Sequence, residues 1–103
     1  MSKFIFAYHG GRSFETREEG AAHMAKWNRW IEGLGEAVVE PGIYFGKSKT
    51  VDTKGIVDGG GANPISGITI VQADTIEAAL EMATVCPHVG IGGSIEVAEA
   101  HQM

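Results

Sequence analysis

The sequence predicts a ferredoxin-like α+β fold, with the order β-α-β-β-α-β, an antiparallel sheet and both helices on one face. Each half of the chain reads as a β-α-β unit, over residues 3–45 and 66–99. Two such units with right-handed crossovers interleave in a single sheet. The length of 103 residues is that of one domain, so residues 1–103 are expected to form a single domain.

The first strand is predicted over residues 3–9. Its side chains are apolar on both faces, which is typical of a central strand covered on both sides. One face carries Phe4, Phe6 and Tyr8, and the other carries Ile5, Ala7 and His9.

The long helix is expected over residues 16–35. Thr16 and Glu19 have the spacing of a capping box at its start. His23 and Trp30 fall on the shoulder of a predicted buried stripe. That stripe, at helical spacing, consists of Met24, Trp27, Ile31 and Leu34.

Residues 37–45 predict a second strand, bent at Pro41 and Gly42. Residues 49–57 predict a short ribbon inserted between the two units. The glycine-rich residues 58–64 predict a loop.

The second unit begins with a strand through the β-branched residues 68–71. A helix follows, with apolar residues at helical spacing over 76–83 and Asp74 as its expected cap, paired with Glu77. Pro87 is expected to end this helix and leave residues 86–93 as a loop, since proline cannot continue a helix. The last strand is expected through Ile95 and Val97.

This topology leaves one face of the sheet bare. A bare apolar face on so small a domain calls for a partner. We therefore expect a homodimer in which two sheets pack face to face, as in a dimeric α+β barrel.

Composition excludes several classes of function. The net charge of −5 argues against nucleic acid and anionic membranes as partners. No apolar run approaches the roughly 20 residues of a membrane span. The first residues read as a strand rather than a signal peptide, and the single cysteine excludes an internal disulfide, so a cytoplasmic location is expected.

The topology also predicts where a functional site would lie. The end of the first strand, the start of the long helix, the loop before Ser66 and residues 86–93 should meet at one edge of the sheet. His9, His23 and His88 are therefore expected to converge there.

His23, beside Trp27 and Trp30, forms the preferred candidate pocket. A histidine with a pKa near ~6.5 exchanges protons near neutrality. The two indoles would stack a flat ligand or exclude water from it. The alternative is that both tryptophans fill the core, since aromatic stripes at helical spacing usually do.

The other candidates also have two interpretations. His88 is either a second acid/base group or a cation favoured at a helix C-terminus. Cys86 is either a ligand contact or nucleophile, or an inert buried thiol. The nearby helix C-terminus favours the inert thiol, because its partial negative charge raises the pKa of a thiol. His9 is either a ligand contact or an ordinary residue at the end of a strand.

Two further kinds of site are not expected. No HxH or HExxH spacing supports a metal site. Residues 46–48 have the letters that end a phosphate-binding loop, but Pro41 stands where that motif needs glycine. No organic cofactor is implied.

The chain resembles the YCII-related proteins, including their DGPF-like branch, over nearly its whole length. The resemblance rests on five segments: Met24-Ala-Lys-Trp27-Asn-Arg-Trp30, Gly46-Lys-Ser-Lys-Thr-Val51, Asp58-Gly-Gly-Gly-Ala-Asn-Pro64, Ala78-Ala-Leu-Glu-Met-Ala83 continuing to Cys86-Pro87-His88, and Gly92-Gly93-Ser-Ile-Glu-Val97. It implies a small bacterial protein with a ferredoxin-like fold that pairs as a dimeric α+β barrel.

The resemblance also implies an active site with a histidine on the first helix and an aspartate. His23 matches that histidine. The chain has Gly20 where the family often has arginine, and Cys86 where it has aspartate before proline.

We expect a small-molecule site at the edge of the sheet under the long helix. His23 and His88 are the candidate catalytic residues, and His9, Trp27, Trp30 and Cys86 the candidate ligand contacts. The reaction would be proton transfer, elimination or hydrolysis on a small, aromatic substrate. The alternatives are a non-catalytic regulatory module that binds a ligand or partner, and a cofactor-free oxygenase.

Overall fold

The computed structural model of the protein describes residues 1–103. Its elements in chain order are β1 (Ser2–Gly10), α1 (Arg17–Leu34), a 3-10 turn (Gly35–Ala37), β2 (Val38–Tyr44), β3 (Lys49–Asp52), β4 (Gly55–Asp58), β5 (Ile65–Ala73), α2 (Ile76–Thr84), α3 (Pro87–Gly90) and β6 (Gly93–Ala100). No helix is long and apolar enough to cross a membrane.

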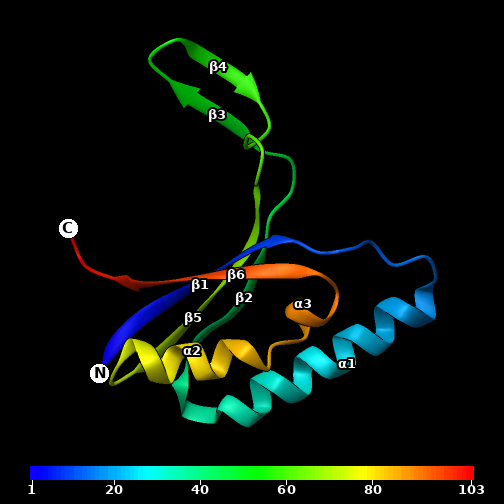
Figure 1. Cartoon of the computed structure of the whole chain (residues 1–103), viewed down its shortest axis with the longest axis vertical. Helices are drawn as coiled ribbons and strands as arrows, with labels where there is room; N and C mark the ends of the chain where they lie inside the picture. The colour runs from blue at the N-terminus through cyan, green and yellow to red at the C-terminus, as the bar shows by residue number, and fades with distance from the viewer.

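The main sheet has the strand order β2-β5-β1-β6, and every neighbouring pair is antiparallel. With β3 and β4 set aside as an insertion, this is the predicted ferredoxin-like order. Helices α1 and α2 lie on the same side of the sheet, and β3 and β4 form a separate hairpin that projects on the opposite side (Figure 1). The predicted fold class is therefore confirmed.

The core lies between the sheet and helices α1 and α2. The expected alternation in β1 holds, because Phe4, Phe6 and Tyr8 are buried on the helix side. They pack with Val71 of β5 and Trp30 of α1.

The other face of the sheet has no cover within the chain. Ile5 and Ala7 pair with Ile70 and Ile68 across β1 and β5, and all four are partly exposed. The sequence predicted β1 to be covered on both faces, and one chain covers only one of them.

The start of α1 follows the prediction. The Thr16 side-chain oxygen accepts a hydrogen bond from the Glu19 N–H at 3.1 Å. The Glu19 carboxylate accepts one from the N–H of Glu15, one residue earlier than a capping box requires.

Three residues of the predicted buried stripe of α1, Trp27, Ile31 and Leu34, pack against the core, and the prediction fails only at Met24 and Trp30. Trp30 is the one buried residue of the helix, whereas Met24 is half-exposed. The reason is that α1 presents Trp30 to Phe6 of the sheet, with ring centroids 6.2 Å apart.

Two predictions in the second unit are wrong. Thr75 rather than Asp74 caps α2, and its side-chain oxygen accepts from the Ala78 N–H at 3.2 Å. Residues 87–90 form the short helix α3 instead of a loop, with Pro87 at its first position. Proline is well suited to start a helix, because the N–H that it lacks has no partner there.

Candidate functional site

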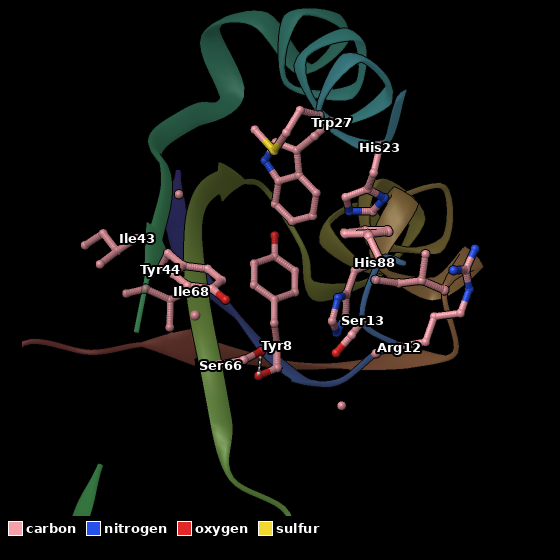
Figure 2. A pocket seen from close by; sticks show the side chains of 17 residues that line it. Tyr8, Arg12, Ser13, His23, Trp27, Ile43, Tyr44, Ser66, Ile68 and His88 are labelled. Atoms are coloured by element: carbon pink, nitrogen blue, oxygen red, sulfur yellow. Dashed lines mark hydrogen bonds between the residues drawn. The ribbon is translucent and has the colours of Figure 1, made fainter. Parts of the chain in front are cut away.

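A cavity of about 630 Å³ opens at the end of the sheet beside α1. Its lining comes from β1 and the segment after it, α1, the end of β2, the start of β5, and α3 (Figure 2). This volume falls within the roughly 300–1,000 Å³ typical of small-molecule sites. The cavity forms at the edge that the topology predicted.

His23 and His88 both line this cavity, although they are 65 positions apart in the sequence. Helix α1 supplies His23, and α3 supplies His88. Trp27 lines the cavity one turn after His23, with the two ring centroids 6.0 Å apart. The three side chains point toward the same space in Figure 2.

Aromatic rings surround the two histidines. The ring centroids of Phe14 and His23 are 4.9 Å apart. The ring centroid of Tyr8 lies 5.1 Å from that of Trp27 and 5.1 Å from that of His88. Tyr44, at the end of β2, also lines the cavity and is 91% exposed. A flat ring would therefore meet aromatic surface on several sides.

The side chains that line the cavity include one formal cation and no carboxylate, although the Glu19 carboxylate lies 3.6 Å from the Arg12 guanidinium. Arg12 is this cation, whereas the chain as a whole carries −5. Desolvation lowers the pKa of His23 below 6.5, and His88, Lys26 and Arg12 lower it further. His23 is therefore mostly neutral at pH 7 and able to accept a proton.

His88 is held in a defined orientation. Its Nε2 donates a hydrogen bond to the backbone carbonyl oxygen of His9 at 2.9 Å. His88 is only 7% exposed, and its Nδ1 has no hydrogen-bond partner in the protein. In the neutral ring, Nδ1 is thus a free acceptor at the cavity.

Gly93 explains how His88 comes so close to β1 and β6. A Cβ at position 93 would collide with the His88 imidazole. Only glycine leaves this space for the ring.

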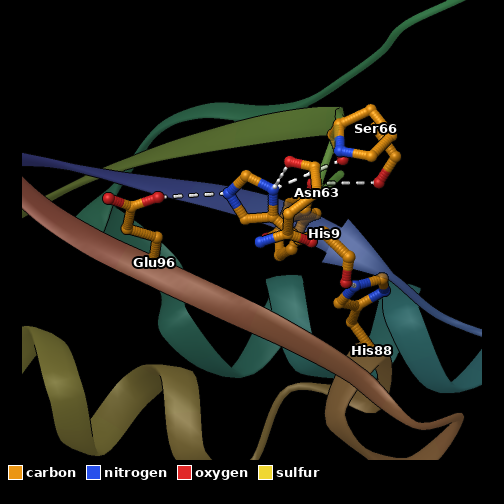
Figure 3. Close-up of polar contacts among 7 residues, drawn as sticks. His9, Asn63, Ser66, His88 and Glu96 are labelled. Atoms are coloured by element: carbon orange, nitrogen blue, oxygen red, sulfur yellow. Dashed lines mark hydrogen bonds and ion pairs between the residues drawn. The ribbon is translucent and has the colours of Figure 1, made fainter. Parts of the chain in front are cut away.

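His9 lies apart from the other two histidines. Tyr8 faces the cavity, and the alternation along β1 turns the His9 side chain to the opposite face of the sheet (Figure 3). There its Nε2 lies 3.1 Å from a Glu96 carboxylate oxygen, and its Nδ1 lies 3.1 Å from the Asn63 carbonyl oxygen. The predicted convergence of all three histidines is therefore wrong for His9: His23 and His88 share the cavity, and His9 reaches His88 only through its backbone carbonyl oxygen.

Trp30 and Cys86 do not line the cavity. Trp30 is in the core, and its indole N–H donates to the Met82 carbonyl oxygen at 3.0 Å. Cys86 is a free, buried thiol, and desolvation raises its pKa to about 11. Both residues are buried, which agrees with the alternative interpretations of Trp30 as a core residue and of Cys86 as an inert thiol.

Sequence reasoning missed Tyr8, Arg12, Phe14 and Tyr44 as lining residues. Tyr8 lies on the core face of β1, and this face continues into the wall of the cavity. Arg12 and Phe14 stand in an irregular segment where no periodicity marks an inward face. No group of three or more histidine, cysteine, aspartate or glutamate side chains in the structure could hold a metal ion.

No protein-family model and no curated protein sequence matches the chain. Among solved structures, the chain is similar to 5-chloro-2-hydroxyhydroquinone dehydrochlorinase (TftG) from Burkholderia phenoliruptrix, in a complex with 2,5-dihydroxybenzoquinone. The match has a TM-score of 0.57 at 18% identity and covers 100% of this chain and 96% of the other. At this identity, the similarity establishes a shared fold.

Proposed function

We propose that the cavity binds a small, flat ring that carries oxygen substituents, and that His23 and His88 are its acid/base pair. The observation that carries this proposal is the pair of histidines in one aromatic-walled cavity without a carboxylate. The bound 2,5-dihydroxybenzoquinone of the structurally similar dehydrochlorinase is a ligand of this class.

The chemistry that this pair supports best is proton transfer leading to elimination. One neutral histidine takes the proton of a ring hydroxyl, and the other, when protonated, donates a proton to the ring carbon that bears the leaving group. Removal of a second hydroxyl proton then expels the leaving group as an anion with its bonding electrons. The net loss is one acid molecule, HX, so the step needs no oxidant or cofactor.

Other parts of the cavity have supporting roles in this proposal. Trp27 and Phe14 provide faces for the ring. Arg12, whose guanidinium also lies 3.6 Å from the Glu19 carboxylate, provides positive charge for a phenolate or a departing anion. Tyr8 is a less suitable acid or base, because its hydroxyl donates to the Thr69 side-chain oxygen at 2.6 Å and burial raises its pKa.

Histidine side-chain NMR with 2,5-dihydroxybenzoquinone tests ligand binding directly. Saturable shifts of His23 and His88 are expected, while His101, exposed near the C-terminus, serves as an internal reference. Shifts confined to His9, or no shifts, would contradict the proposed site.

Chloride release from a chlorinated hydroxyhydroquinone tests the reaction. We expect release by the wild type, a loss of at least roughly a hundredfold in His23→Gln and His88→Gln, and no change in His101→Gln. Binding without release would favour the alternative, a non-catalytic ligand-binding module.

We also propose that the protein forms a homodimer through the uncovered face of the main sheet. Partly exposed Ile5, Ile68 and Ile70 on that face support this pairing. The order of strands is compatible with membership of the YCII-related proteins, which we propose on the motifs given above. A cytoplasmic location is part of the same proposal and is supported by the single, free cysteine.

A further inference from the structure

We infer that the β3–β4 hairpin is an arm that clasps a second copy of the chain. The arm comprises residues 46–63, which leave the main sheet at the end of β2 and return at the start of β5. This inference extends the proposed homodimer, and it concerns a segment that contributes to neither the core nor the cavity.

The arm has too little support within its own chain. Strand β3 pairs only with β4, and every residue of both strands except Thr50 is exposed. A two-stranded hairpin without further packing is marginally stable in water at best. A hairpin of regular register is therefore expected to pack against something else.

The arm also carries an apolar surface. Val51 and Ile56 are directly paired, so their side chains share one face, and they are 74% and 68% exposed. Val57, on the other face, is 58% exposed. The arm thus exposes apolar side chains on both of its faces, and the Val51–Ile56 pair is the surface that a partner would cover.

The solvent-accessible surface of the chain indicates how much area each copy would bury against the partner. The chain exposes 7276 Å², against about 5,600 Å² expected for a monomeric protein of its mass, an excess of about 1,700 Å². Its radius of gyration is 14.9 Å, against about 13 Å for a compact chain of this length. An excess of this size per copy is what an obligate homodimer buries.

The direction of the arm identifies the partner as the copy on the uncovered face. The arm rises from the sheet on the side away from α1 and α2 (Figure 1). Packed sheets lie about 10 Å apart, while the four residues of β3 alone span about 13 Å. An arm of that length passes beyond the plane between two sheets and flanks the second copy, and two-fold symmetry makes the contact mutual.

The root of the arm is fixed to the same face. The His9 ring lies 3.1 Å from the carbonyl oxygen of Asn63 and 3.3 Å from that of Pro64, where the arm rejoins β5. Figure 3 shows this contact beside the Glu96 side chain of β6. The His9 side chain thus contacts the base of the arm on the face of the sheet where a second copy would pack.

Mass measurement by light scattering over a dilution series tests the inference. The double variant Val51→Asp/Ile56→Asp should weaken dimerisation by at least roughly a hundredfold, because each dimer would bury four carboxylates in place of apolar groups. Val85→Asp is the matched control, since Val85 is 71% exposed at the end of α2 and outside the arm. It should leave the dimer unchanged.

Ile70→Asp, on the sheet face, separates the arm from the dimer itself. If Ile70→Asp yields monomers while the arm variant dimerises like the wild type, the arm inference fails and the sheet-face dimer stands. A wild type that stays monomeric at every concentration overturns both. Hydrogen exchange of the wild type adds a readout without mutation, since the amides of residues 49–58 should gain protection as the concentration rises.

Discussion

The His88 side chain is tied to the backbone of His9 by a 2.9 Å hydrogen bond between residues 79 positions apart. This bond joins α3 to the central strand β1 and fixes which nitrogen of His88 carries the proton. The carbonyl oxygen of His9 thereby orients the His88 imidazole in the cavity. The His9 side chain lies on the other face of the sheet, where it contacts the Asn63 carbonyl oxygen. One residue thus links the candidate site to the root of the arm.

Gly93→Ala should displace His88 from this position. The added methyl group would collide with the imidazole, so we expect a loss of about 1–3 kcal/mol in the free energy of unfolding and a large loss of ligand affinity. Chemical denaturation and the NMR signals of His88 measure the two effects.

Gly90→Ala is the control for that substitution, because no atom lies within 4 Å of its added Cβ. It should leave both stability and the His88 signals close to those of the wild type. Unchanged stability in Gly93→Ala would mean that the ring of His88 is free to move aside.

The pKa of His23 gives a prediction about pH. Desolvation, and then His88, Lys26 and Arg12, lower the pKa of His23 below its unfolded value of about 6.5. The unfolded chain therefore binds the proton more readily, so His23 favours folding above pH 6.5 and this contribution is lost as the pH falls through the folded pKa.

NMR titration should give a midpoint below 6.5 for His23. An anionic ring in the cavity should raise that midpoint, because it adds a negative charge beside the imidazole. In His23→Gln the fall of stability with acid should be smaller than in His101→Gln. A free-protein midpoint above 6.5 would contradict the described surroundings of His23.

The fold could be predicted because its signals are local. Alternation in residues 4–8 and capping by Thr16 each depend on neighbours in sequence, and both are seen in the structure. Burial of Trp30 rather than Met24 depends on how α1 rotates against Phe6, which no helical spacing specifies. The same holds for the cap of α2, where two adjacent residues, Asp74 and Thr75, are both suitable by type.

The site could be predicted only in part, for the same reason. The topology predicts that His23 and His88 lie at one edge of the sheet, and both line the cavity there. The prediction that His9 joins His23 and His88 is wrong. Side chains alternate along a strand, so His9 lies on the face of β1 opposite Tyr8 and away from the cavity. Arg12 and Tyr44 join the cavity through irregular segments, whose course depends on tertiary packing.

Cys86 should be unreactive in the folded protein. The thiol is buried, and desolvation raises its pKa to about 11, so little thiolate forms near pH 8. A thiol reagent such as DTNB should label the native protein at least roughly a hundredfold more slowly than the denatured protein. Rapid labelling of the native protein would revive Cys86 as a ligand contact or nucleophile.

Substitutions of the two tryptophans should have different effects, because Trp30 lies in the core and Trp27 lines the cavity. Trp30→Phe removes an indole N–H that donates to the Met82 carbonyl oxygen, so about 1–3 kcal/mol of the free energy of unfolding should be lost. Trp27→Phe keeps an aromatic ring at the cavity wall and should cost less stability, whereas Trp27→Ala should weaken binding of 2,5-dihydroxybenzoquinone about tenfold. Denaturation and NMR titration of all three variants give the comparison. Equal losses of stability and ligand affinity at both positions would show that the cavity and the core respond as one unit, and that Trp27 has no separate role toward a ligand.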